Sequence, residues 1–166
     1  MKKTILINGI FGGLIASTLL AIMTVYMKLN PNYEPSPIMG FGGMLLAFGF
    51  IYLGLKQQKL AQNGNLSFKE GLLTGTLITL VISTMYVLVW LFIHYLYFPD
   101  FMEQYGKLVL KNSKPEDLAA KTAEINQMKE WYKNPIMVIL LSYVEVFPFG
   151  ILVSLVAALI LKSKKN

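Results

Sequence analysis

The chain has 166 residues, of which 55% are hydrophobic and 14% are charged, and its net charge at pH 7 is +6. A soluble domain of this size contains about 25% charged residues, so the composition excludes an ordinary soluble protein and is typical of a chain that crosses a membrane repeatedly. The absence of cysteine excludes disulfide frameworks, thiolate metal sites and cysteine nucleophiles.

Four apolar segments are long enough to cross a bilayer. A helix rises about 1.5 Å per residue and the hydrocarbon layer is about 30 Å thick, so roughly 20 residues span it. The segments cover residues 4–27, 38–55, 71–98 and 135–161. They predict an all-α integral membrane protein with one membrane domain, residues 1–166, that forms a four-helix transmembrane bundle.

The first segment has two interpretations. Lys2 and Lys3 followed by an apolar run would also fit a cleavable signal peptide. The run continues to Met27, which is too long for a signal-peptide core, and the residues around Ser17 form a poor cleavage pattern. An uncleaved first span is therefore the favoured interpretation.

The segment between the second and third spans, residues 56–66, is predicted to be a short loop. It ends near Asn63-Gly64-Asn65, which is a turn signal. Ser67 and Glu70 then have the spacing of a capping box, in which each side chain bonds to the other residue's backbone amide. The third helix is expected to begin there.

Residues 99–134 form the only sizeable segment outside the spans, and they predict a helical hairpin between spans three and four. Helix-start signals occur at Asp100 and at Ser113. The second predicted helix is imperfectly amphipathic, which suits a membrane surface or a partner helix, although a simple connecting hairpin remains open. Its apolar stripe comprises Leu118, Thr122, Ile125, Met128 and Tyr132.

Lysine placement predicts the orientation. With four spans, both termini share one side with the 56–70 segment, and that side holds 8 lysines in 23 residues (1–3, 56–70 and 162–166). The other side holds 7 lysines in 46 residues (28–37 and 99–134). Cytoplasmic loops are enriched in lysine, so both termini are expected in the cytoplasm and the hairpin outside it. Aromatic residues near the predicted outer interface agree: Tyr26, Trp90, Tyr95, Tyr97, Trp131 and Tyr132.

Small residues recur every fourth position in three spans. Such ridges allow close approach of helix backbones, which is what holds helices together in lipid. Since the ridges fall in the predicted cytoplasmic half, the bundle is expected to be tight there and wider outside. The ridges are Gly9, Gly13, Ser17 and Ala21; Gly71, Gly75, Thr79 and Ser83; and Gly150, Ser154 and Ala158.

Glu145 is the main candidate for a functional polar site. It lies ten residues into the fourth span, about 15 Å deep, where an ionised acid is costly. Pro148 frees the carbonyl group of Val144 beside it, and Ser83 or Thr84 could accept a hydrogen bond from a protonated Glu145. A proton or ion site and a neutral acid that locks a kink are both open interpretations.

No other residue set predicts chemistry. His94, the single histidine, is interpreted as an interfacial anchor near the outer end of span three. No hydrolase, metalloprotease or nucleotide-binding motif occurs, so we expect no catalytic residues, no cofactor and no metal.

Several stretches, taken in order, resemble the family called domain of unknown function 4199. They are Gly9 and Gly13, residues 66–71, residues 97–101, residues 128–135, Glu145, Gly150 and residues 155–162. The family comprises small four-span membrane proteins, mainly from Bacteroidota. The resemblance implies the bacterial inner (cytoplasmic) membrane, and it implies no activity.

The favoured expectation is a non-enzymatic structural, accessory or interaction protein. Its expected partners are the lipid bilayer and either a second copy of the chain or another membrane protein. Nucleic acid is not expected, because the lysines lie beside apolar segments. The alternative is a small oligomeric transporter or channel that uses Glu145.

Overall fold

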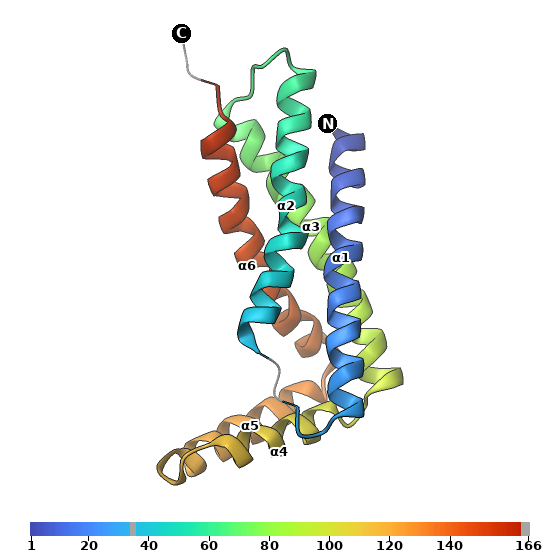
Figure 1. Cartoon of the computed structure of the whole chain (residues 1–166), viewed down its shortest axis with the longest axis vertical. Helices are drawn as coiled ribbons and strands as arrows, with labels where there is room; N and C mark the ends of the chain where they lie inside the picture. The colour runs from blue at the N-terminus through green and yellow to red at the C-terminus, as the bar shows by residue number, and fades with distance from the viewer. Residues whose placement is uncertain (34–35, 164–166) are drawn as a thin grey trace.

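Long apolar sequences become long helices in this protein, because backbone groups in lipid must be satisfied within the segment. A computed structural model describes residues 1–33 and 36–163, and all regular secondary structure in those residues is helical. Four long helices run along the length of the molecule, and two short ones lie across one end (Figure 1). The long helices are α1 (Lys2–Leu29), α2 (Pro37–Ala61), α3 (Phe68–Phe92) and α6 (Pro135–Leu161). The shorter elements are η1 (Ile93–Tyr97), α4 (Phe101–Asn112), η2 (Pro115–Asp117) and α5 (Leu118–Tyr132).

Four helical segments are long and apolar enough to cross a membrane, as the sequence predicted. They are Lys2–Leu29, Ile38–Ala61, Phe68–Tyr97 and Pro135–Leu161. The third begins as an α-helix and ends in η1, which is a π-helical turn closed by a 2.7 Å bond from the Phe98 amide to the Ile93 carbonyl. Turns of this kind occur often at functional positions of helices.

The second helix is longer than predicted, and the expected loop at residues 56–66 begins only after Ala61. The polar residues at this end stay helical because their side chains find buried partners. Asn8 donates to Gln57 at 2.9 Å, and Thr74 donates to Gln58 at 2.5 Å. Polar bonds between helices therefore extend the bundle beyond the apolar stretch of the second span.

The predicted capping box is confirmed at the start of α3. Ser67 Oγ accepts from the Glu70 amide at 3.3 Å, and the Glu70 carboxylate accepts from the Ser67 amide at 3.1 Å. The turn before it contains Asn63 and Gly64 with positive φ angles of 53° and 84°.

The two ends of the described chain lie at the same end of the bundle, opposite α4 and α5 (Figure 1). Ser163 fastens the end of α6 to the loop before α3, since its hydroxyl donates to the Gly64 carbonyl at 2.6 Å and its amide donates to the Leu66 carbonyl at 2.8 Å. Lys164 and Lys165, which contribute to the lysine count above, lie outside the described residues.

Neither helix start predicted for residues 99–134 uses its expected side-chain cap. The Asp100 carboxylate accepts from the Gln104 side chain at 2.9 Å, and the Ser113 hydroxyl donates to the Val109 carbonyl at 2.6 Å. Two helices nevertheless form. In the α5 stripe only Ile125 is fully buried, and it packs against Gly106 of α4, while Leu118 and Thr122 are exposed.

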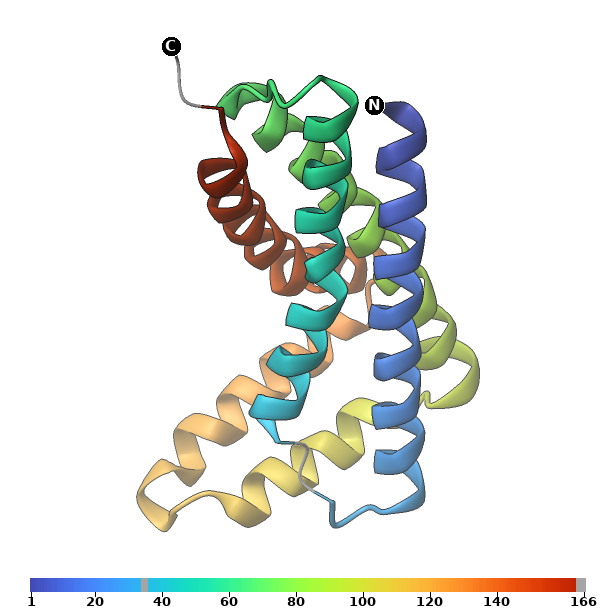
Figure 2. The same ribbon diagram turned by 45° about the horizontal axis from the view of Figure 1, so that its top comes forward.

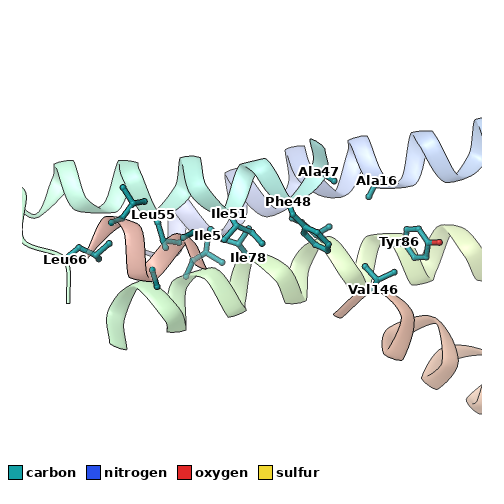
Figure 3. Close-up of a cluster of buried hydrophobic side chains, with 14 residues drawn as sticks. Ile5, Ala16, Ala47, Phe48, Ile51, Leu55, Leu66, Ile78, Tyr86 and Val146 are labelled. Atoms are coloured by element: carbon teal, nitrogen blue, oxygen red, sulfur yellow. The ribbon is translucent and has the colours of Figure 1, made fainter. Parts of the chain in front are cut away.

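The larger buried cluster runs from Leu66 to Tyr86 and Val146 (Figure 3), and a smaller one is formed by Trp90, Ile93, Phe98 and Val138. The larger cluster is filled mainly by two helices. Phe48, Ile51 and Leu55 from α2 interlock there with Ile78 and Ile82 from α3. All five side chains are at most 1% exposed. Toward the other end α6 bends away from this axis (Figure 2), and Pro148 lies within the helix. A proline inside a helix removes one hydrogen bond and favours such a bend.

Candidate functional site: a pocket around Glu145

The small-residue ridges of α3 and α6 face each other. The helices are antiparallel, and three small residues of one meet three small residues of the other. At the centre of this contact Thr79 Oγ1 lies 3.1 Å from Ser154 Oγ. A Cβ atom added at Gly75 or Gly150 would lie less than 3.0 Å from atoms of the facing helix, and one at Gly71 would lie 3.2 Å from Ala158. The facing pairs are Gly71 with Ala158, Gly75 with Ser154, and Thr79 with Gly150.

The ridge of α1 meets a different face of α3. Gly9 lies against Val81 and Gly13 lies against Met85, so glycines on α1 receive larger side chains from α3. Ser17, the next member of the ridge, is buried, and its hydroxyl has no partner among the described residues. At the α1–α3 contact, large side chains of α3 therefore pack against glycines of α1, and small residues do not face each other.

The bundle opens toward α4 and α5, where a pocket of about 230 Å³ lies between all six α-helices. Its walls are largely apolar, with a few polar groups. The polar and aromatic lining residues are Thr24, Tyr86, Trp90, Phe101, Tyr132 and Glu145. The remaining lining residues are Ala16, Leu19, Leu20, Met23, Met27, Met39, Gly40, Gly43 and Met44. A concave apolar site with few converging polar groups is the usual form of a ligand site.

Glu145 carries the only charge on the described lining of this pocket. Its side chain is exposed to the pocket rather than packed, and it makes no hydrogen bond or ion pair within residues 1–33 and 36–163. Intramembrane acids are normally paired or hydrated, because the charged form is costly in a low dielectric. The group is therefore available to a proton, water or a ligand.

The partners that the sequence suggested for Glu145 are not the ones that the structure provides. The Thr84 hydroxyl bonds to the Leu80 carbonyl at 2.7 Å and to the Tyr143 hydroxyl at 2.8 Å. Ser83 is fully buried, and no partner for its hydroxyl occurs in the described part of the chain. Neither residue lines the pocket, whereas Tyr86 and Tyr132 do, and both lie near Glu145.

Pro148 lies three residues after Glu145, on an exposed part of α6. Having no amide proton, it leaves the Val144 carbonyl without its usual helical donor. The described hydrogen bonds include none from Glu145 to this carbonyl. Pro148 therefore shapes the bend but does not belong to the pocket lining.

Among the polar residues of the pocket, sequence reasoning missed Tyr86 and Thr24, and it placed Trp90 and Tyr132 only as interfacial aromatics. Burial raises the pKa of the Tyr132 phenol to about 12, and the nearby Glu145 adds to the rise. A signal was present on α3, since Tyr86 and Trp90 are four residues apart and share a helix face.

His94 belongs to a neighbouring cavity of about 300 Å³ at the junction of η1, α4 and α5. The side chain is buried, its Nδ1 atom has no partner in the described structure, and its ring lies 5.2 Å from the Tyr132 ring. Tyr132 lines both cavities, whereas Glu145 lines only the first and His94 only the second. The structure shows that this histidine at the end of span three is buried, and its interpretation as an interfacial anchor stays a prediction.

The chemistry available in the pocket is binding and proton exchange. Within residues 1–33 and 36–163, no cluster of three or more histidine, cysteine, aspartate or glutamate side chains could hold a metal ion. The carboxyl group can hold a proton or a cation, and the phenols and the indole can donate hydrogen bonds or present their ring faces.

One family model, described as "Protein of unknown function (DUF4199)", matches residues 8–163. No curated protein and no solved structure matches the chain.

Proposed function

We propose that this chain, which belongs to the DUF4199 family of unknown function, is a small, non-enzymatic transporter that binds its ligand at Glu145. One observation carries this proposal, namely an acid that has no partner among residues 1–33 and 36–163 and lies in a largely apolar pocket of a four-span bundle. An acid that only locked a kink would use its carboxyl group in an internal hydrogen bond, and Glu145 makes none among the described residues.

We place this transporter in the bacterial inner membrane, with both termini in the cytoplasm and α4 and α5 on the outer side. The lysine excess at the end of the bundle that holds Met1 and Ser163 supports this orientation. Accessible tags at either terminus and within residues 113–115 test it in intact cells. A tag in 113–115 that reports from the cytoplasm would contradict the orientation.

Four spans leave little room for an enclosed pathway through one copy of the chain. The proposal therefore includes assembly of two or more copies around the pocket. Cross-linking in native membranes measures this assembly, and a chain that is monomeric in lipid yet still transports would contradict it.

Ion flux in proteoliposomes tests the role of Glu145 directly. Glu145→Gln and Glu145→Leu remove the charge without removing any internal hydrogen bond, so both variants are expected to fold and to lose Glu145-dependent flux of protons or ions. Glu116→Gln is the matched control, since Glu116 is exposed on the far lobe and pairs only weakly with Lys114 at 3.8 Å. Full flux in Glu145→Leu would overturn the proposal.

A structural or accessory role is the second candidate, and it rests on the lobe formed by α4 and α5. Leu118 at the tip of this lobe is 39% exposed and Trp131 is 37% exposed, which leaves apolar surface for a membrane surface or a membrane-protein partner. Replacing Leu118 by Lys is expected to weaken such a contact without changing flux. Loss of co-purifying protein in that variant alone would favour the accessory role.

A further inference from the structure

We infer that the ligand of the Glu145 pocket is a small organic cation with an apolar body, such as a protonated or quaternary amine. This inference rests on the proposed function, because it names the ligand of the same site. Charge, ring faces, wall chemistry and size each point to this class.

The charge of the pocket selects a cation. Glu145 is the only carboxyl group on the described lining, and no lysine or histidine lies there. The nearby Lys28 is engaged elsewhere, since its ammonium group donates to the Tyr97 carbonyl and lies 4.2 Å from the centre of the Tyr97 ring. An anion would find no positive partner, whereas a cation would neutralise Glu145 in a low dielectric.

Aromatic rings strengthen the preference. Trp90 and Phe101 meet edge to face at a centroid distance of 4.8 Å, and Tyr86 and Tyr132 complete an aromatic wall. Ring faces attract cations, by about 2 kcal/mol or more where water is excluded, and they recognise quaternary ammonium groups in particular. Tyr132 is neutral at physiological pH, as phenols ordinarily are, so it does not compete as an anion.

The part of the lining that α1 and α2 provide suits an apolar body rather than a bare ion. It contains four methionines, Met23 and Met27 from α1 and Met39 and Met44 from α2. Methionine side chains are flexible and polarisable, and they adapt to different apolar shapes. A hard metal ion would need several oxygen ligands, and the described lining offers only one carboxylate.

The volume sets an upper limit on size. At about 230 Å³, the pocket is smaller than the roughly 300–1,000 Å³ that drug-sized ligands occupy. A single aromatic or short alkyl ammonium ion fits this space, and a large multi-ring cation does not.

Binding of such a cation would release a proton from Glu145. A carboxyl group in apolar surroundings holds its proton until a cation stabilises the charged form. The cation then forms an ion pair with the Glu145 carboxylate, and the proton leaves to the water phase. The titratable groups that face Glu145 are Tyr86 from α3 and Tyr132 from α5, while the lining residues of α1, α2 and α4 are not titratable. The apparent affinity is therefore expected to rise with pH.

Trp90 allows a direct test. The chain has two tryptophans, and Trp131→Phe leaves Trp90 as the only one, within the pocket lining. We would titrate this variant in lipid nanodiscs with benzyltrimethylammonium, with its uncharged analogue neopentylbenzene, and with benzenesulfonate. The expected result is a saturable change in Trp90 fluorescence with the cation alone. Glu145→Gln should weaken this binding by about tenfold or more, whereas Glu116→Gln should not.

The second readout is proton release, followed with an indicator dye in weak buffer. Cation binding to the Trp131→Phe protein should release protons, and binding to the same protein with Glu145→Gln should not. Equal binding of neopentylbenzene, unaffected by Glu145→Gln, would overturn the cation class and leave the ligand pocket standing. Binding of silver(I), but not of the organic cation, would overturn it in favour of thioether coordination. Absence of binding by every probe, with Glu145-dependent flux intact, would overturn only this inference. Loss of both binding and flux would overturn the proposed function as well.

Discussion

Gly75 of α3 and Ser154 of α6 approach so closely that a Cβ atom on Gly75 would lie 2.8 Å from Ser154 Cβ and 2.9 Å from Ser154 Oγ. One turn further along α3, Thr79 shares a hydrogen bond with the same serine. Lipid offers no hydrophobic drive between helices, so close backbone approach and such bonds hold this interface together. In this structure the ridge packs two helices of the same chain against each other.

Gly75→Ala is expected to lower the free energy of unfolding by roughly 1–3 kcal/mol, because the added methyl group must displace Ser154 in a closely packed interface. Unfolding of the detergent-solubilised protein, followed by circular dichroism, measures the change. Gly49→Ala is the matched control, since no heavy atom lies within 4 Å of its added Cβ, and it should be neutral or stabilising by up to about 1 kcal/mol. Equal stability of the two variants would contradict the packing described here.

Ser67→Ala should destabilise α3 by about 0.5–2 kcal/mol, because it removes the side-chain acceptor of the capping box. Ser113→Ala is the comparison, since the Ser113 hydroxyl bonds back to the Val109 carbonyl and caps no helix start. Its effect should be close to zero. Hydrogen exchange of the Glu70 amide localises the difference, and equal protection of this amide in wild type and Ser67→Ala would contradict the role of the box.

Thr74 and Gln58 form a buried hydrogen bond at the end of the bundle that contains the chain ends. A double-mutant cycle with Thr74→Val and Gln58→Leu is expected to give a coupling free energy of about 0.6 kcal/mol, and at most about 1.7 kcal/mol, which is the range for such bonds in membrane proteins. Thr122→Val combined with Gln58→Leu is the control cycle, because the Thr122 hydroxyl bonds only within its own exposed helix. Coupling of equal size in both cycles would show that the measured energy is not that of the bond.

The buried phenol of Tyr132 is expected to make the folded protein less stable at alkaline pH. Its pKa is about 12 in the folded protein and about 10 when exposed, so the unfolded chain loses the phenolic proton first. This contribution is fully present below pH 10 and is lost as the pH rises toward 12, with a slope of at most about 1.4 kcal/mol per pH unit. Denaturation curves at increasing pH should therefore fall less steeply for Tyr132→Phe than for the wild type. Parallel curves would show that the phenol is not buried as described.

Local features of the chain were sufficient to predict the spans, the capping box and the family. Apolar length decides whether a segment can cross a membrane, and a capping box depends on two residues three positions apart. The same local reasoning erred where partners are distant, as at the end of α2, where Asn8 and Thr74 extend the helix to Ala61. It also gave no sign that His94 is buried beside Tyr132, because that contact joins η1 to α5.

The pocket is the property that only the tertiary structure decided. Sequence alone selected Glu145 from the cost of an acid in lipid, and it selected the glycine ridges from their spacing of four. It could not supply the pocket residues Tyr86 and Tyr132, which lie 46 positions apart in the chain and meet the acid only because α6 bends and α5 folds back beneath the bundle. Composition and periodicity report how one helix faces its surroundings, whereas a binding site forms where several helices converge, and that convergence depends on the packing of the whole chain.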